Sequence, residues 1–153
     1  MSDTPFLLDQ FLPYRLSVLS NRLSAAIAES YSRRYGLSIP EWRVIAMLAH
    51  APGASAAEVA ERTAMDKVAV SRAVRRLQQT GRVSRRMAAG DRRRSMLDLT
   101  ADGRRIYARV TPALRRYEEA LLTALDRSER EALGTLLRRL ETRAGALPPP
   151  VID

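Results

Sequence analysis

Apolar residues recur every three or four positions along two long stretches of the chain, one near each end. In residues 7–35 the repeat runs from Leu16 to Tyr31. Residues 100–144 carry the same repeat, and Pro112 falls inside it. This spacing places side chains on one face of a helix, and an internal proline bends a helix. We therefore predict long amphipathic helices at both ends, with a kink near Pro112.

Serine followed three residues later by glutamate marks three predicted helix starts. The pairs are Ser38 with Glu41, Ser55 with Glu58, and Ser128 with Glu131. In this pattern each side chain hydrogen-bonds the backbone of the other residue, which caps the helix. The first two pairs predict short helices over residues 39–50 and 55–63, and the third predicts the start of the last helix.

A further short helix is predicted over residues 66–80. Its apolar stripe consists of Val70, Val74 and Leu77, and Gly81 ends it. The three residues Thr63, Ala64 and Met65 connect this helix to the preceding one. Two short helices joined by a tight turn are typical of a helix-turn-helix.

Beyond Gly81 the apolar period shortens to two. Val83 in one run, and Leu97 and Leu99 in another, alternate with polar neighbours, which predicts two strands of a hairpin. Residues 87–94 lie between the runs, and we expect them to form a glycine-containing tip that carries several arginines. A hairpin that follows a helix-turn-helix is a wing.

The net charge of the chain is +9, and nearly all of it lies in one segment. Residues 66–94 hold ten basic and two acidic residues, a net charge of +8, whereas the rest of the chain carries +1. Codon usage explains why every basic residue but Lys67 is arginine, but it would spread the charge evenly. A solvated charged face is the alternative. A localised excess fits a surface that faces phosphates, so we expect double-stranded DNA as a partner.

The composition disfavours several other kinds of site. Without cysteine the chain has no disulfide, thiolate metal site or cysteine redox sensor, and a single histidine argues against zinc. The sequence has no glycine-rich phosphate loop and no nucleophile with an adjacent base, so we expect neither an enzyme nor a cofactor. It has no apolar run near the roughly 20 residues that cross a bilayer and no evident signal peptide, so a cytoplasmic location is expected.

The predicted helix over residues 66–80 presents small and cationic side chains opposite its apolar stripe, as a recognition helix requires. Seven of them are expected to contact DNA: Lys67, Val68, Ala69, Ser71, Arg72, Arg75 and Arg76. We assign base edges to Ser71 and Arg72, because arginine binds guanine in bidentate fashion. Val68 and Ala69 suit a thymine methyl group, and the other three suit phosphates.

The wing adds a second group of expected DNA contacts, namely Arg86, Asp91, Arg92, Arg93 and Arg94. An arginine inserted into a narrow minor groove reads its shape and negative potential. Asp91 carries the wrong charge to approach DNA, so we expect it to orient Arg93 through a charge-assisted hydrogen bond.

Three stretches of the sequence resemble the MarR family of winged helix-turn-helix transcriptional regulators. The wing motif is Asp91-x-Arg93, five residues and then Leu99-Thr100, and the strand entry is Gly81-x-Val83-x-Arg85. The recognition-helix pattern consists of Lys67, Val70, Ser71, Arg72, Val74, Arg76 and Leu77. The resemblance extends over residues 7–144. One departure is Arg82, where the family usually has an apolar residue, and it would alter packing under the wing or add a phosphate contact.

The resemblance implies a fold class that is mainly α with a small β-hairpin wing, in a single domain of residues 1–153. Residues 39–99 would form the winged helix-turn-helix, and residues 7–35 and 100–144 a helical dimerisation region. Their apolar stripes are also too long for a winged helix alone to cover, although an intramolecular bundle would cover them too. A homodimer would place two recognition helices about 34 Å apart on a pseudo-palindrome. Residues 145–153, which include three prolines, should form a loose tail.

Regulators of this family usually respond to small molecules, often phenolic or aromatic acids. Candidate ligand-binding residues are Tyr14, Arg15, Trp42, Met47 and His50. For Trp42 a place in the core, and for His50 a place at a helix end, are the competing interpretations.

The sequence therefore predicts a sequence-specific DNA-binding transcriptional regulator, a repressor that a small ligand releases from DNA. The alternative is an architectural DNA-binding protein with no effector and little sequence preference, because charge alone would serve that function equally well.

Overall fold

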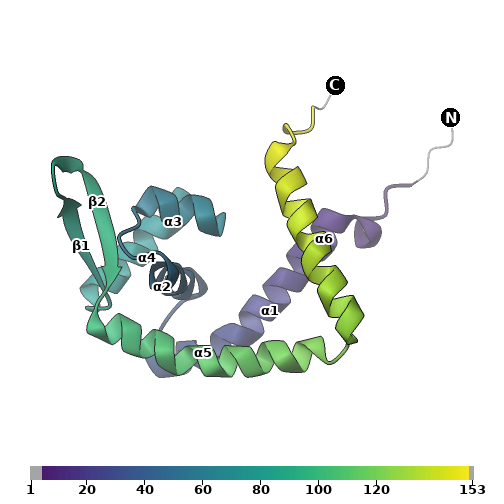
Figure 1. Ribbon diagram of the computed structural model, residues 1–153, viewed down its shortest axis with the longest axis horizontal. Helices are drawn as coiled ribbons and strands as arrows, with labels where there is room; N and C mark the ends of the chain where they lie inside the picture. The colour runs from purple at the N-terminus through teal and green to yellow at the C-terminus, as the bar shows by residue number, and fades with distance from the viewer. Residues whose placement is uncertain (1–4, 152–153) are drawn as a thin grey trace. The chain divides into compact units, whose positions relative to one another are not determined.

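The computed structural model describes residues 5–151, with the side chains of Ala88 and residues 91–94 left out. It forms two compact units, Met1–Leu114 and Arg115–Asp153. Figure 1 shows the order of the elements along the chain. They are a 3-10 helix (η1, Leu8–Gln10), α1 (Leu12–Tyr35), α2 (Ile39–His50), α3 (Ala56–Thr63), α4 (Lys67–Gln79), β1 (Val83–Ala88), β2 (Asp91–Leu99), α5 (Ala101–Leu122) and α6 (Arg127–Ala146). The predicted fold class, mainly helical with a two-stranded wing, is confirmed.

The first predicted helix is interrupted near its start. The 3-10 turn precedes α1, and Pro13 occupies the first turn of α1, where the missing N–H costs nothing. The helix ends as expected at Gly36, whose φ of 61° lies in the left-handed region and whose N–H donates to the Ser32 carbonyl at 2.8 Å.

Both predicted capping boxes at the short helices are present. Ser38 N donates to Glu41 Oε2 at 2.8 Å, and Ser55 N donates to Glu58 Oε2 at 2.7 Å. The serine hydroxyls accept the reciprocal bonds at 3.3 and 3.2 Å. These bonds fix where α2 and α3 begin, one residue after each serine.

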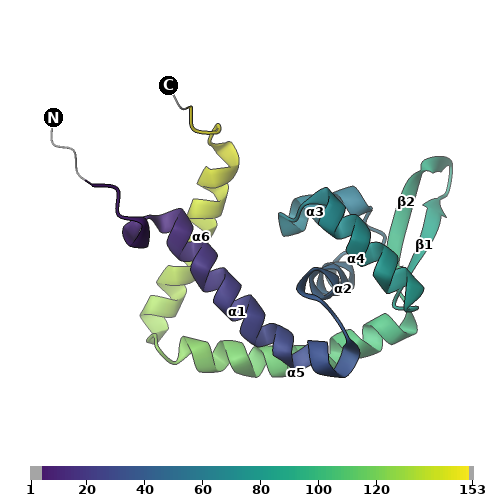
Figure 2. The same cartoon turned by 180° about the vertical axis from the view of Figure 1, so that it is seen from behind.

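A single apolar core joins α2, α3, α4 and the hairpin. Its fully buried side chains include Ile45, Val59, Val74 and Leu97, one from each of these parts. Figure 2 shows α4 beside α3 and next to β1. The apolar stripe predicted for α4 is buried, which fixes the orientation of its opposite face.

The hairpin is longer than the sequence predicted. The strands pair antiparallel from Val83 with Leu99 to Met87 with Ser95, and Ala88 pairs with Asp91 after a change of register. The prediction that residues 87–94 form the tip is therefore wrong, because the strands extend into this segment and leave Ala89 and Gly90 between them. Gly90 has φ of 83°, a conformation that suits glycine in a tight turn.

Helix α5 begins under the wing. The Thr100 hydroxyl accepts from Gly103 N at 3.2 Å and donates to the Gly81 carbonyl at 2.7 Å, so it caps the helix as predicted and ties it to the end of α4. The helix continues through Pro112 without interruption, and the kink stays a prediction.

The second unit contains the end of α5 and α6. The α6 cap is Asp126, not Ser128 as predicted: Asp126 Oδ1 accepts from Glu129 N at 2.9 Å, and Glu129 Oε2 accepts from Asp126 N at 2.8 Å. The bond from Glu129 N lowers the pKa of Asp126 below its usual value. Among the described residues, no helix is both long and apolar enough to span a membrane.

Candidate DNA-binding surface

One face of α4 is a continuous exposed surface at the end of the helix-turn-helix. Lys67, Ser71, Arg72, Arg75 and Arg76 are exposed. Val68 is 56% exposed, whereas Ala69 is half-buried. The structure thus places the seven predicted helix residues together, with Ala69 at the edge of the surface.

The α4 N-terminus is held in place by its cap. Asp66 Oδ1 accepts from Val68 N at 2.9 Å and from Ala69 N at 3.0 Å. Ala64, in the turn before it, has φ of 51°, and Met65 N donates to the Ala60 carbonyl at 3.1 Å. These bonds define the three-residue turn that directs the first residues of α4 outward.

The guanidinium groups of Arg72, Arg75 and Arg76 have no ion-pair or hydrogen-bond partner among the described side chains. Unpaired exposed arginines need not break an internal bond to meet an anion. This part of the surface can therefore bind phosphates or guanine edges without a rearrangement of the protein.

One of the predicted wing residues, Arg86, is held by an ion pair within the hairpin. Arg86 Nε lies 2.8 Å from Asp98 Oδ2, across the hairpin, and its side chain is 60% exposed. This pair fixes the direction of Arg86 along the wing and compensates part of its charge. Asp98 did not stand out in the sequence, because only the register of the hairpin places it near Arg86. The side chains of Asp91, Arg92, Arg93 and Arg94 lie outside the described residues.

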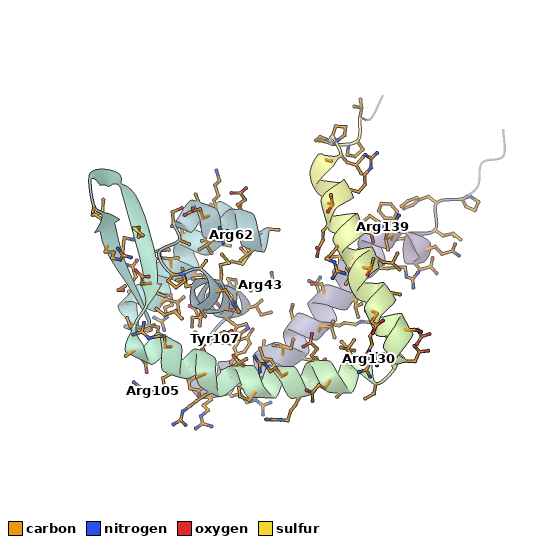
Figure 3. All side chains as sticks on the ribbon, in the orientation of Figure 1. Arg43, Arg62, Arg105, Tyr107, Arg130 and Arg139 are labelled. Atoms are coloured by element: carbon orange, nitrogen blue, oxygen red, sulfur yellow. The ribbon has the colours of Figure 1, made fainter. Side chains whose placement is uncertain are left out.

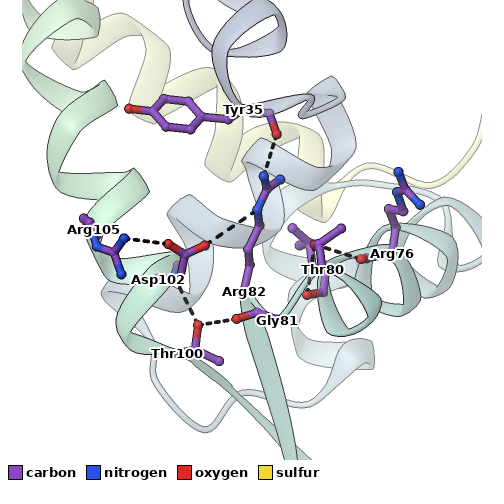
Figure 4. Close-up of polar contacts among 10 residues, drawn as sticks. Tyr35, Arg76, Thr80, Gly81, Arg82, Thr100, Asp102 and Arg105 are labelled. Carbon is purple, nitrogen blue, oxygen red and sulfur yellow. Dashed lines mark hydrogen bonds and ion pairs between the residues drawn. The ribbon is translucent and has the colours of Figure 1, made fainter.

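Arg82 packs under the wing. Its Nη2 donates to the Tyr35 carbonyl at 2.6 Å, and its Nε lies 4.0 Å from Asp102 Oδ2 (Figure 4). Its side chain is 17% exposed. Of the two expectations for Arg82, the structure shows the internal packing contact, which connects the end of α1 to the start of α5.

The candidate ligand residues fall into two separate groups. Tyr14 and Arg15 line a surface hollow of about 560 Å³ on η1 and α1, together with residues such as Leu19 and Arg22. Trp42, Met47 and His50 belong to α2, and none of them lines this hollow. Within the single chain the two groups do not form one site.

The α2 group forms part of an aromatic stack. The Trp42 ring lies between Tyr31 and Tyr107, with centroid distances of 5.3 and 6.0 Å, and it is 8% exposed, so its role in the core is confirmed. Burial raises the pKa of Tyr31 above its usual value, and the positive charge of Arg43 opposes the rise.

His50 ends this stack. Its Nε2 lies 3.1 Å from the hydroxyl of Tyr107, the labelled residue that reaches from α5 toward α2 in Figure 3. Met47 packs partly buried against the core. A hollow of about 260 Å³ lies beside them, lined in part by Leu48, Arg104 and Tyr107. Arg104 and Tyr107 did not stand out in the sequence, because both lie off the apolar stripe of α5.

The comparisons with known proteins agree with this geometry. The model of the MarR family matches residues 35–94, which contain α2, α3, α4 and most of the wing. An HTH-type transcriptional repressor of Mycobacterium tuberculosis is 29% identical over 131 residues, which cover 85% of this chain and 91% of the relative.

Solved structures extend the similarity to nearly the whole chain. A MarR/EmrR family transcriptional regulator from Acinetobacter sp. ADP1 matches with a TM-score of 0.84 at 25% identity, covering 93% of this chain and 100% of that protein. PcaV, a transcriptional regulator from Streptomyces coelicolor solved in complex with its natural ligand, matches with a TM-score of 0.71 at 25% identity over 92% and 99% of the two chains.

The winged helix, the family match and the fold define a DNA-binding regulator of transcription. By these matches the chain is similar to regulators of the MarR family.

Proposed function

We propose that the chain is a sequence-specific repressor that binds a pseudo-palindromic operator with α4 in the major groove. The exposed face of α4 carries this proposal: small side chains at its N-terminal turns adjoin arginines without internal partners. Ser71 and Arg72 contact base edges, and Lys67, Arg75 and Arg76 contact phosphates. The basic wing residues, Arg93 foremost, enter the minor groove.

A homodimer is part of the proposal, because each long helix leaves apolar side chains exposed. In α1 these include Leu12, Leu16 and Leu19, and in α6 they include Leu136 and Leu140. Exposed apolar surface of this extent is typical of a protein interface. Two copies related by a two-fold axis would present two α4 helices to successive turns of one DNA face.

A small aromatic acid is the proposed effector. The hollow beside α2 offers the phenol ring of Tyr107 and the cation of Arg104, and its other walls include the aliphatic Leu48. The carboxylate of Asp98 also lines it and is paired with Arg86. Ligand pockets commonly combine apolar walls with few polar groups. The ligand in the PcaV structure supports a ligand-responsive function. Arg104 Nη1 donates to the Leu99 carbonyl at 2.6 Å, so a carboxylate that draws Arg104 away would loosen the base of the wing.

Two single substitutions on α4 test the DNA-binding assignment. Arg72→Ala should weaken operator binding about 10- to 100-fold and relax preference at one base pair, because it removes a bidentate base contact. Arg76→Ala should weaken binding to every sequence by a similar factor and lower the slope of log affinity against log salt by about 1. Fluorescence anisotropy with an operator library at several salt concentrations measures both effects.

The control is Arg116→Ala, an exposed arginine of α5 outside this surface. Native operator affinity in both α4 variants would refute the proposal. A uniform loss for all sequences in Arg72→Ala, together with no discrete footprint at physiological salt, would support the architectural alternative instead.

A further inference from the structure

A third hollow lies where three parts of the first unit meet, on a different side of α5 from the hollow beside α2. It has a volume of about 330 Å³. Its lining residues come from the end of α1, the residue that precedes β1, and the first turns of α5: Arg34, Tyr35, Arg82, Asp102, Arg105, Ile106 and Arg109. None of them belongs to the exposed face of α4 or to the hollow beside α2.

The charge of this hollow is strongly unbalanced. Four guanidinium groups meet one carboxylate, so its net charge is +3. Asp102 is already shared, with Oδ1 3.2 Å from Arg105 Nη1 and Oδ2 4.0 Å from Arg82 Nε (Figure 4). Arg109 has no ion-pair partner among the described side chains.

Two of the arginines, Arg82 and Arg34, also make contacts that do not neutralise them. Arg82 donates to a backbone carbonyl, that of Tyr35. The Arg34 guanidinium lies 5.7 Å from the centre of the Tyr35 ring, in a cation–π arrangement. Arg105, which is labelled in Figure 3, projects outward from α5. These two contacts hold Arg82 and Arg34 in place and leave most of their N–H donors available.

We propose that this hollow binds a small phosphate-bearing anion. Guanidinium forks match phosphate oxygens in bidentate fashion, and several of them together exceed what one carboxylate can accept. The volume lies at the lower end of ligand pockets, which suits a compact ligand such as a diphosphate. The buried Ile106 and the half-buried Tyr35 supply the apolar part of the wall.

Binding of pyrophosphate to the full chain, measured by titration calorimetry, tests the proposal. Chloride at equal ionic strength controls for screening, and citrate controls for carboxylates. The double variant Arg105→Gln with Arg109→Gln removes two exposed cations of the hollow, and the pair Arg115→Gln with Arg116→Gln makes the same charge change farther along α5. We expect the first variant to lose at least tenfold in pyrophosphate affinity and the second to keep it.

Three results would overturn the proposal: no heat beyond that of chloride, equal binding of citrate, or equal loss in both double variants. The phosphate of DNA is the other source of this chemistry. If the first variant alone lowers the salt dependence of operator binding while the native chain binds no pyrophosphate, the hollow contacts the DNA backbone and not a free anion.

Discussion

Gly103 allows a close backbone approach between α5 and the base of the wing. A Cβ atom at this position would collide with the carbonyl oxygen of Arg82, which belongs to the backbone and cannot swing away. The same carbonyl accepts from Thr100 N at 3.1 Å. One residue without a side chain therefore permits the close approach of the start of α5 to the residue that precedes β1.

Gly103→Ala should lower the free energy of unfolding by about 2 kcal/mol, because the clash must be relieved by backbone movement. Urea unfolding monitored by circular dichroism measures the change. Gly134→Ala is the matched control: it lies in α6 and meets only the end of the flexible Arg138 side chain. It should raise stability by about 0.5–1 kcal/mol, since alanine favours helix. Equal effects in the two variants would refute the clash.

Tyr31 makes the stability of the first unit depend on alkaline pH. Burial raises the pKa of its phenol above its usual value near 10, so the folded state holds this proton more tightly than the unfolded state. Its contribution to stability is therefore complete below pH 10 and is lost as pH rises through the folded-state pKa.

Tyr31→Phe should reduce the fall in stability between pH 9 and about pH 11, because phenylalanine keeps the ring contact with Trp42 and has no proton to lose. Urea midpoints at a series of pH values measure this. The exposed Tyr14→Phe serves as control; if it flattens the alkaline decline as much as Tyr31→Phe does, burial of Tyr31 is not the cause.

At the scale of elements, α4 depends on its cap for both stability and direction. Asp66→Ala leaves the N–H groups of Val68 and Ala69 without their acceptor, and should cost about 1 kcal/mol. Operator affinity should fall as well, because the first turn of α4 frays. Asp66→Asn keeps an acceptor oxygen and should retain stability. Thermal unfolding of both variants measures the difference. A loss of equal size in both variants would point to the charge of Asp66 and not to its cap.

The sequence predicted those elements whose signals are local. The caps at Ser38 and Ser55, the stop at Gly36 and the buried stripe of α4 depend on residues within one or two turns. The α6 cap was misplaced because Asp126 and Ser128 each precede a glutamate by three residues. Only the bonds actually formed distinguish the two.

Features that depend on pairing between distant parts of the chain were harder to predict from the sequence. Glycine beside several arginines is typical of a loop, yet the cross-strand pairing extends the hairpin to Ala88 and Asp91. The contacts of Arg82 with Tyr35, and of Tyr107 with His50, join positions 47 and 57 residues apart. No periodic pattern encodes such contacts. The sequence therefore predicted the exposed face of the candidate site but not the hydrogen bonds that support it.

At the scale of the whole molecule, α6 has an apolar face without a cover of its own. None of its 20 residues, all of which the structure describes, is buried, and Leu133, Leu136, Leu137 and Leu140 are exposed. In the proposed homodimer a second chain covers this face.

Leu136→Glu combined with Leu140→Glu should convert the dimer to a monomer, because charges cannot be buried in an apolar interface without a partner. Size-exclusion chromatography with light scattering reports the mass, and operator affinity should fall with it. Arg139→Glu, on the same helix, is the control and should remain dimeric. A native chain that is monomeric at micromolar concentration would contradict the proposed assembly.

The exposed apolar face of α6 also has a consequence for gene dosage. When a helix is covered only by a second copy, its stability depends on protomer concentration. At low expression the amount of assembled regulator then rises with the square of the number of chains per cell. Halving the supply of chains would reduce occupied operators by more than half, so that the repressed state would depend steeply on copy number.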